Sequence, residues 1–306
     1  MVSVDDIRKI FRGHIAVGEP LSKYTSFRIG GPADFYLEPV DKYDLIEVAR
    51  FFKKLDYRFM VIGKGSNLLI SDNGFRGAAI NLEEGLGNVS IEKGLVVADA
   101  GVRLSKFVDF CIQHEKAGVE MLAGIPGTIG GAVIMNAGAY GGEISDHLVE
   151  VEIYRDDAIR KVTKAESGFS YRRSGFARDV VLNASFSLPA GNLTEMLLRR
   201  RELLLKRNQS QPLNLPNSGS MFKNPQGTFA AKLVEEAGLK GTRIGGAEIS
   251  ERHGNFILNH GDATAHDVLE LVKLARTQVF DRTGIKLELE VKLVGFEETE
   301  LVEAVV

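Results

Sequence analysis

The sequence predicts an α+β protein made of two or three domains, and three observations support this prediction. A chain of 306 residues is long for one hydrophobic core and suits several domains of ordinary size. Short β-like segments outnumber amphipathic helices up to residue 188. The Pro/Gly/Asn cluster LPAGNLT (188–194) then ends the strands, and a strongly helical segment follows. We therefore expect a domain boundary near residue 192.

The predicted helices are segments in which apolar residues recur every three or four positions. In the first of them, Leu45, Val48 and Phe52 follow this spacing behind Asp41, a residue type that caps helix N-termini well. The same periodicity predicts helices at 41–55, 103–116, 195–209, 228–237 and 264–283. The basic run LLRRRELLLKR in the third helix is interpreted as its solvent-exposed face.

The predicted strands are short, rich in β-branched and aromatic residues, and bounded by Gly, Asn or Asp. They lie at 58–67, where the strand runs into a glycine turn, and at 78–82, 149–155, 179–188, 254–259 and 286–295, with a hairpin at 88–99. The sequence shows no internal repeat and no low-complexity tract.

The charge balance argues against polyanionic partners. The 38 basic and 41 acidic residues leave a net charge of −3, which exerts no general attraction on nucleic acid or an anionic membrane. Residues 121–142 carry no charged side chain, but proline, asparagine and glycine keep this segment well below the apolar content of a membrane span. We therefore expect neither a nucleic-acid nor a membrane partner, and any anionic ligand must be held locally.

The cysteine, the histidines and the N-terminus exclude other classes. Cys111 is the only cysteine, which rules out an intrachain disulfide and a thiolate zinc cluster, and its apolar surroundings favour a small buried hydrophobe over a reactive thiol. The six histidines show no metal-ligand spacing, so we expect no catalytic metal. The N-terminal residues carry acids where a signal peptide carries bases, so we expect a cytoplasmic protein.

The segment GIPGTIGGAVIMNAGAYGG (124–142) has seven glycines and no charge. Each ordered glycine costs roughly 0.5–1 kcal/mol relative to alanine, so we expect a need for bare backbone. One interpretation is that the glycines present N–H groups to a pyrophosphate or lie against a ring. The alternative is a tightly packed structural crossover.

Two further segments resemble parts of a phosphate site. GKGSNLL (63–69) follows a strand and could form an anion-binding nest around Gly63, Gly65, Ser66 and Asn67, although it lacks the third glycine of a dinucleotide fingerprint and could be a plain turn. YTSFRIGGPAD (24–34) supplies hydroxyls, Arg28 and a Gly-Gly-Pro turn. Several such loops together favour an extended, doubly charged ligand such as a dinucleotide.

Three other segments carry candidate chemistry. In FSYRRSGF (169–176), Arg172 or Arg173 could fork onto a carboxylate or phosphate, or the loop could simply be solvated. In NSGSMFKNP (217–225), no histidine or aspartate lies nearby to build a triad, so Ser220 is a better proton donor than nucleophile, unless the cluster only caps a turn. LELEVKLVG (287–295) puts its two glutamates on one strand face, where they are either exposed or lining a pocket.

Taken in order, seven segments resemble the UDP-N-acetylenolpyruvoylglucosamine reductase family, flavoenzymes of peptidoglycan precursor synthesis. The segments are YTSFRIGGPAD, GKGSNLL, GIPGTIGGAVIMNAGAYGGEI, FSYRRSGF, NSGSMFKNP, GGAEISERHGNFILN and LELEVKLVG. Each is weak alone, but their order and spacing from about residue 20 to residue 295 are specific.

The resemblance implies a particular α+β architecture. An FAD-binding module of the PCMH or vanillyl-alcohol-oxidase type would have two subdomains, 1–84 and 85–192, and a C-terminal α+β domain, 193–306, would bind the substrate. The last strand and the tail would pack back on the first subdomain. The glycine run would be the loop that closes over the pyrophosphate and ring of FAD.

The resemblance also implies the cofactors. FAD would bind non-covalently, because the phosphate loop has no histidine of the kind that some relatives link to flavin, and NADPH would be the co-substrate. The residues assigned to FAD are Tyr24, Thr25, Arg28, Ile62, Gly63, Gly65, Ser66, Asn67, Leu68, Gly124, Pro126, Gly127, Thr128, Gly130, Gly131, Asn136, Gly138, Ala139, Gly141 and Ile144.

The family's catalytic residues map onto Arg172 of the YRxS motif, Ser220 of GSxFKNP and Glu290 of the C-terminal strand. Arg172 and Glu290 would hold and polarise the substrate carboxylate, and Ser220 would protonate the carbon next to the site of hydride transfer. The implied substrate contacts are Tyr171, Lys223, Asn224 and His253. The short span before Ser220 resembles the compact class of the family, which lacks a tyrosine-bearing insertion, and leaves Lys206 or Arg207 to cap the diphosphate.

The implied reaction is the NADPH-dependent reduction of UDP-N-acetylglucosamine enolpyruvyl ether to UDP-N-acetylmuramate through FAD. The partner would be this UDP-sugar, and we expect a monomer. Two alternatives remain open: another FAD-dependent oxidase or dehydrogenase of the same superfamily, and a nucleotide-sugar binding protein without catalysis.

Overall fold

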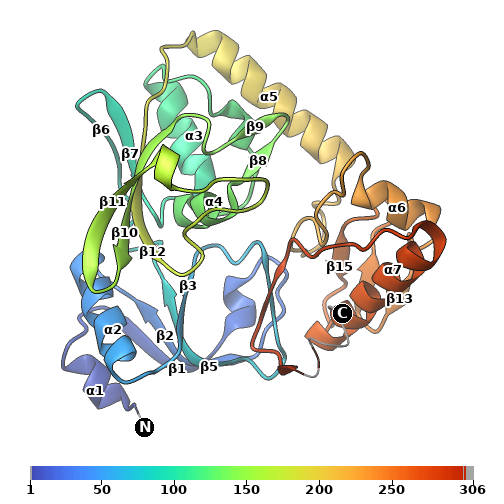
Figure 1. The fold of residues 1–306 in the computed structure, drawn as a ribbon, viewed down its shortest axis with the longest axis horizontal. Helices are drawn as coiled ribbons and strands as arrows, with labels where there is room; N and C mark the ends of the chain where they lie inside the picture. The colour runs from blue at the N-terminus through green and yellow to red at the C-terminus, as the bar shows by residue number, and fades with distance from the viewer. Residues whose placement is uncertain (1, 299, 301–306) are drawn as a thin grey trace. The chain divides into compact units, whose positions relative to one another are not determined.

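The computed structural model describes residues 2–298 and 300, and the chain forms two compact units that are each discontinuous in sequence (Figure 1). Unit 1 takes its described residues from Met1–Val17, Phe35–Lys64 and Gly77–Arg207. Unit 2 takes them from Gly18–Asp34, Gly65–Arg76 and Asn208–Val306. The three domains expected from the sequence are defined by the ligand that each part binds and stay a prediction; the end of the tail lies outside the described residues.

All five predicted helices are confirmed. The helices of the described residues are α1 (Val4–Arg8), α2 (Lys42–Lys54), α3 (Leu104–Gln113), α4 (Ile129–Met135), α5 (Leu193–Ser210), α6 (Ala230–Glu236) and α7 (Ala265–Thr283), with short 3₁₀ turns at Leu21–Tyr24, Glu120–Leu122 and Lys164–Glu166. Asp41 caps α2 as predicted, because its side chain accepts hydrogen bonds from the N–H groups of Tyr43 and Asp44.

Two sheets supply most of the strands. The five-stranded antiparallel sheet of unit 1 has the order β11-β10-β12-β7-β6 and is made of β6 (Val89–Glu92), β7 (Leu95–Asp99), β10 (Leu148–Arg155), β11 (Ala158–Thr163) and β12 (Val180–Phe186). A four-stranded sheet has the order β1-β2-β5-β3 and is made of β1 (His14–Pro20), β2 (Pro32–Glu38), β3 (Phe59–Ile62) and β5 (Phe75–Asn81).

The remaining strands are short. In unit 1, β8 (Gly138–Ala139) and β9 (Gly142–Glu143) form a small hairpin. In unit 2, a three-stranded sheet is made of β13 (Arg243–Ile244), β14 (Ala247–Ile249) and β15 (Ile257–Asn259), and β16 (Lys292–Val294) pairs in parallel with β4 (Leu68–Ile70).

The strand predictions are confirmed in place but not always in extent. The predicted strand at 286–295 shortens to β16, because residues 287–291 make only an isolated bridge, from Leu289 to Phe222, in place of a continuous ladder. Its predicted alternation is confirmed, since Leu287 and Val291 are buried and Glu288 is exposed. The N-terminal strands β1 and β2 and the helix α4 were not predicted, because glycine and proline interrupt their patterns.

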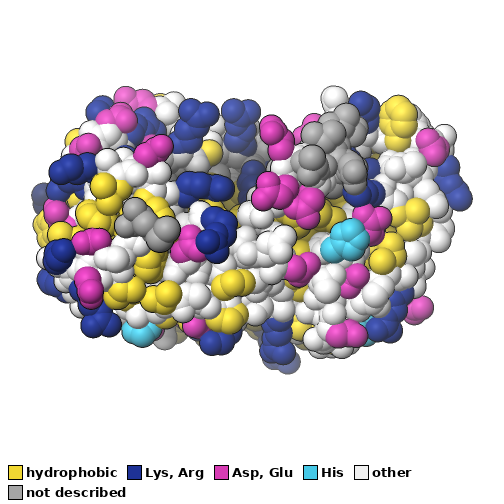
Figure 2. All heavy atoms as spheres, turned by 90° about the horizontal axis from the view of Figure 1, so that it is seen from below, with side chains coloured by type: hydrophobic (Ala, Val, Ile, Leu, Met, Phe, Trp, Pro, Cys, Tyr) yellow, Lys and Arg dark blue, Asp and Glu magenta, His cyan; other side chains and the backbone are white. Residues whose placement is uncertain are grey.

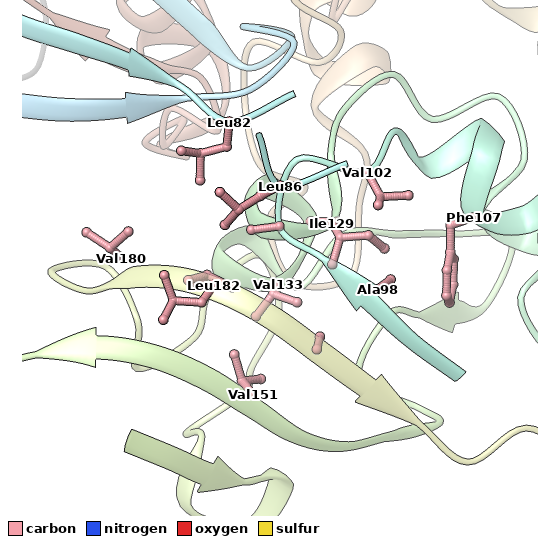
Figure 3. Close-up of a cluster of buried hydrophobic side chains, with 14 of the residues drawn as sticks. Leu82, Leu86, Ala98, Val102, Phe107, Ile129, Val133, Val151, Val180 and Leu182 are labelled. Carbon is pink, nitrogen blue, oxygen red and sulfur yellow. The ribbon is translucent and has the colours of Figure 1, made fainter. Parts of the chain in front are cut away.

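The core of unit 1 contains residues of the glycine run (Figure 3). Ile129 and Val133, one helical turn apart on α4, lie among Ala98 of β7, Val151 of β10 and Leu182 of β12. Burying such a side chain contributes about 1.5–3 kcal/mol. These two contacts therefore anchor the middle of the run to the five-stranded sheet.

Cys111 is also part of this core and is fully buried. Burial raises the pKa of its thiol to about 12, which keeps it protonated at neutral pH. The predicted role as a buried hydrophobe is confirmed.

The core of unit 2 gathers apolar residues from segments that also carry candidate site residues. Met221 and Phe222 of the GSMFKNP segment, Leu287 of the C-terminal segment and Phe27 of the YTSFRIGG segment pack in one cluster. Because these side chains are buried, the core fixes the backbone position of the polar residues that stand next to them in the sequence.

The surface shown in Figure 2 mixes basic and acidic side chains, with hydrophobic ones between them. This mixture agrees with the near balance of charge in the sequence. Within residues 2–298 and 300, no helix has the length and apolar content needed to cross a membrane.

Candidate active site

The glycine run is not the single loop that the sequence suggested. It consists of a turn at Gly127, the helix α4, a left-handed residue at Asn136 and the hairpin of β8 and β9. Since Ile129 and Val133 are core residues, the part of the run between them is a structural crossover. Backbone contacts with a ligand are left to the exposed positions.

Two neighbouring glycines of α4 differ in what their bare backbone allows. The N–H of Gly130 donates to Ala100 O (2.8 Å), and a Cβ there would lie 3.1 Å from the Cβ of Ala100. Gly131 is exposed, and the nearest atom to an added Cβ would be Thr128 Oγ1 at 3.7 Å. Gly130 therefore permits close packing inside the fold, while Gly131 presents bare backbone outward.

The end of β3 lies against the start of α4. A Cβ on Gly63 would overlap the hydroxyl of Thr128, so this close approach requires glycine. The N–H of Leu104 donates to Gly127 O (3.0 Å), which adds α3 to the same corner. The first residue of the GKGSN loop and the glycine run thus adjoin within unit 1.

Asn136 ends α4 with an unsatisfied acceptor. The residue is fully buried and left-handed, with φ of 44°. Its Nδ2 donates to Glu143 Oε2 (2.6 Å) and to Ser170 O (3.1 Å), while its Oδ1 has no hydrogen-bond partner among the described residues. A buried polar atom in this state is rare in folded proteins and calls for a donor from a water or a ligand.

Arg172 lies at the tip of a tight turn in unit 1. The N–H groups of Ser170 and Arg173 each donate to the other residue's carbonyl (3.0 Å both), and Arg172 has φ of 55°. The Arg172 guanidinium lies 5.1 Å from the centre of the Tyr171 ring, a cation–π distance. Because Asn136 donates to Ser170 O, the turn is attached to the end of α4.

Of the two predicted diphosphate caps, Arg207 lies beside the glycine run. An added Cβ on Gly124 would lie 3.0 Å from Arg207 Cδ, and Tyr140 Oη donates to Leu203 O on the same helix, α5 (3.3 Å). Burial lowers the pKa of Arg207 from its ordinary value. Lys206 is exposed.

In unit 2, the YTSFRIGG segment adjoins the rest of the GKGSN loop. Ser26 N–H donates to Gly65 O (3.2 Å), and Gly65 has φ of +56°. A Cβ on Gly65 would overlap the carbonyl oxygen of Tyr24. Only glycine therefore meets both the conformation and the spacing at position 65.

The same loop contacts the segment that carries Glu290. Asn67 Nδ2 donates to Glu290 O (3.0 Å), and Lys292 N–H donates to Asn67 O (3.0 Å). A predicted cofactor residue thus holds the backbone of a predicted catalytic residue.

Backbone hydrogen bonds join the segment that carries Ser220 to the segment that carries Glu290. Glu290 N–H donates to the carbonyl of Met221, the residue after Ser220 (2.8 Å), and Lys223 N–H donates to Glu288 O (2.8 Å). Glu288 is 74% exposed at its side chain and pairs with Lys223 Nζ (3.1 Å), whereas Glu290 is half-buried. This difference favours Glu290 over Glu288 as the functional carboxyl.

Two predicted substrate contacts have structural partners. Asn224 Oδ1 accepts from Ala230 N–H (3.1 Å) at the start of α6. His253 Nδ1 accepts from Asn255 N–H (3.3 Å), its ring packs edge-on against Phe256, and burial lowers its pKa. Asn255 itself was missed by sequence reasoning; its only signal was an amide inside the apolar segment GNFILN.

The other predicted cofactor residues divide between the units. Ile62 and Ile144 have buried side chains in unit 1. Unit 1 also contains Gly124, Pro126, Gly127, Thr128, Gly138, Ala139 and Gly141, and unit 2 contains Tyr24, Thr25, Arg28, Ser66 and Leu68.

Family models match both parts of the chain. Residues 33–160 match a model described as an FAD binding domain, and residues 211–294 match the C-terminal domain of UDP-N-acetylenolpyruvoylglucosamine reductase.

Curated relatives and a crystal structure are similar over nearly the whole chain. The UDP-N-acetylenolpyruvoylglucosamine reductase of Chloroherpeton thalassium is 47% identical over 97% of this chain and 99% of its own length. That of Caldanaerobacter subterraneus subsp. tengcongensis is 41% identical over 96% of this chain and 98% of its own. The crystal structure of UDP-N-acetylenolpyruvylglucosamine reductase from Thermus caldophilus is 35% identical, with a TM-score of 0.80 over 92% of this chain and 99% of that one.

Proposed function

The chain belongs to the UDP-N-acetylenolpyruvoylglucosamine reductase family, and on this premise we propose which of its residues perform the family's reaction. The protein is an FAD-containing, NADPH-dependent oxidoreductase. It reduces UDP-N-acetylglucosamine enolpyruvyl ether to UDP-N-acetylmuramate, a step of peptidoglycan precursor synthesis.

The residues of unit 1 fit FAD. The buried acceptor Asn136 Oδ1 offers a hydrogen bond to a ligand donor, and Gly131 and Gly141 present exposed backbone with no side chain in the way. We assign these positions, with the corner at Gly63 and Thr128, to the flavin. When bound, FAD supplies a two-electron carrier that accepts hydride from NADPH and passes it to the methylene carbon of the enolpyruvyl ether.

The backbone hydrogen bond between Glu290 and Met221, the residue after Ser220, carries the proposal. A hydride added to the methylene carbon leaves negative charge on the neighbouring carbon and its carboxylate, which must be stabilised and then protonated. Ser220 is the proton donor to that carbon, and its proton is replaced from solvent. The half-buried Glu290 shares a proton with the substrate carboxylate, which draws charge away from the reacting carbon.

Arg172 is the proposed ligand of the substrate carboxylate. The guanidinium of Arg172 is oriented by the Tyr171 ring and presents paired donors to the carboxylate. Lys223, Asn224, Tyr171 and His253 are the remaining proposed substrate contacts. We assign the diphosphate to Arg207, because this residue lies beside the glycine run.

The UDP-sugar is the proposed partner, and we propose that the protein acts as a monomer. We place it in the cytoplasm, because NADPH and nucleotide sugars are cytoplasmic metabolites. Neither nucleic acid nor a metal takes part in the proposed reaction.

An anaerobic visible spectrum of the purified protein tests this function. Addition of NADPH should bleach the oxidised flavin, and subsequent addition of the UDP-sugar enolpyruvyl ether should restore the colour. Flavin that bleaches and stays bleached would favour a different dehydrogenase or oxidase. A colourless protein that FAD cannot reconstitute would favour a binding protein without catalysis.

A further inference from the structure

The segment that carries Ser220 is held by a side chain from the neighbouring sheet. Asn255, just before β15, is 3% exposed. Its Oδ1 accepts from Phe222 N–H (2.9 Å) and its Nδ2 donates to Phe222 O (2.8 Å). Its own carbonyl accepts from Met221 N–H (2.9 Å).

The Asn255 amide therefore takes the place of a paired strand. Both backbone groups of Phe222, its N–H and its C=O, are bonded to this amide. The carbonyl of the preceding residue, Met221, accepts from Glu290 N–H (2.8 Å). Since Asn67 in turn donates to Glu290 O (3.0 Å), hydrogen bonds run without a break from Asn255 to the GKGSN loop.

We propose that Asn255 is a positioning residue for the proton-transfer step, through the two-bond clamp between its amide and the Phe222 backbone. This inference rests on the proposed roles of Ser220 and Glu290. The clamp fixes the backbone position of the residues that follow Ser220. Because Glu290 N–H donates to Met221 O, the clamp also fixes the backbone position of Glu290. A shift of the order of 1 Å at a reacting group can cost about 100-fold in rate.

The chemistry of an amide suggests a decisive variant, Asn255→Asp. A protonated carboxyl has the same shape and makes both bonds, because its C=O accepts from Phe222 N–H and its O–H donates to Phe222 O. An ionised carboxylate only accepts, and it would face the Phe222 carbonyl oxygen. The clamp in this variant is therefore intact at low pH and lost as pH rises through the carboxyl pKa, which burial raises.

The measurement is the anaerobic reoxidation of NADPH-reduced enzyme by the UDP-sugar enolpyruvyl ether as a function of pH. The titratable groups that surround position 255 include His253, whose Nδ1 accepts from the Asn255 N–H, Glu251 and Arg252 in the same loop, Lys240, whose charge acts on His253, and Lys223, Glu288 and Glu290 on the adjoining segments. Wild-type enzyme carries the same groups, so the ratio of variant to wild-type rate isolates position 255.

We expect this ratio to be near one at low pH and to fall roughly tenfold per pH unit above the carboxyl pKa, until it levels off about 100-fold down. Asn255→Leu should be slow at every pH. The rate of flavin reduction by NADPH should change by less than about threefold in both variants, because neither Ser220 nor Glu290 has a proposed role in that half-reaction.

A flat ratio, or equal losses in the two half-reactions, would overturn the proposal. If Asn255→Leu does not fold, the pH dependence of Asn255→Asp decides by itself. Asn183→Asp is the matched control: its amide, on β12 in unit 1, donates to Glu152 Oε1 (3.2 Å), a side chain with no proposed role in the reaction, so its ratio should be flat.

Wild-type and Ser220→Ala enzyme in the same assay separate this inference from the proposed function. Reduced wild type that the substrate does not reoxidise would remove the proposed reaction. A fully active Ser220→Ala variant would remove the serine's role. With both controls as expected, the Asn255 variants test the clamp alone.

Discussion

The two compact units hold their functional segments by different means. In unit 1, apolar side chains of α4 pack into the core and so hold the glycine run in place. The groups left for a ligand are backbone atoms at glycines such as Gly131. In unit 2, the amides of Asn67 and Asn255 fix the backbone beside Glu290 and Ser220, and the groups left for chemistry are side chains.

This difference suits the role that we propose for each segment. Packing against a flat cofactor demands the absence of side chains, which a core-anchored, glycine-rich helix provides. Proton transfer requires the donor and acceptor atoms to be well aligned, because hydrogen bonds weaken steeply when they are misaligned. Unit 1 should therefore be sensitive to added volume, and unit 2 to lost or altered polar groups.

Ser220→Ala should have the largest effect. Loss of a general acid costs roughly 10²–10⁴-fold, so reoxidation of the reduced enzyme by substrate should fall by this factor while reduction by NADPH is unchanged. Stopped-flow absorbance measures both steps. Ser218→Ala, which removes a buried hydroxyl 3.4 Å from Met221 Sδ, is the matched control and should be nearly neutral. Parental turnover by Ser220→Ala would remove its assignment as proton donor.

Glu290→Gln should follow, with a loss of about 100-fold in the same step, because an amide cannot share a proton with the substrate carboxylate. The backbone bonds to Met221 and Asn67 do not involve the altered group and should keep the segment in place. Glu288→Gln removes only an exposed ion pair with Lys223 and should change the rate by less than about threefold. A larger loss in Glu288→Gln than in Glu290→Gln would reverse the assignment.

Gly65→Ala asks whether unit 2 also depends on a missing side chain. The positive φ costs about 1–2 kcal/mol for alanine, and overlap with Tyr24 O adds to it. Gly238→Ala has a similar φ of +75° but no atom within 4 Å of the new Cβ. Urea unfolding of the FAD-free proteins should show the greater destabilisation at position 65. Equal losses at the two positions would show that the Tyr24 contact relaxes without cost.

Gly131→Ala should separate stability from cofactor binding. Since the new methyl on this helix would make one ordinary contact, with Thr128 Oγ1 at 3.7 Å, and no clash, the FAD-free protein should gain about 0.5–1 kcal/mol of stability. The same methyl would meet a flavin that approaches the bare backbone, so FAD affinity should fall by about tenfold, which fluorescence titration can follow. Unchanged affinity would place the flavin away from Gly131.

His253 should give the smallest effect, visible only in acid. Burial lowers its folded-state pKa below the ordinary value of 6.5, so the unfolded chain takes up the proton first. The free energy of unfolding should therefore fall as pH drops below 6.5, and His253→Gln, which can retain an acceptor, should fall less steeply. Identical slopes for the two proteins in urea unfolding would exclude this contribution.

Local patterns in the sequence determined a large part of the fold. Each predicted helix is present, because its apolar residues recur every three or four positions and so act within a few positions of each other. The order of seven short motifs also indicated the family and the candidate residues Arg172, Ser220 and Glu290. These features depend on neighbours in the chain, so the sequence displays them directly.

Only the tertiary structure decided how the segments are held. Helix α4 forms inside a glycine run because Ile129 and Val133 meet a sheet made of distant strands, which overrides the low helix propensity of glycine. Asn67 bonds to Glu290 across 223 positions and Asn255 bonds to Phe222 across 33. A side-chain amide can bond to any backbone that the fold brings near, and no periodicity in the sequence records which one.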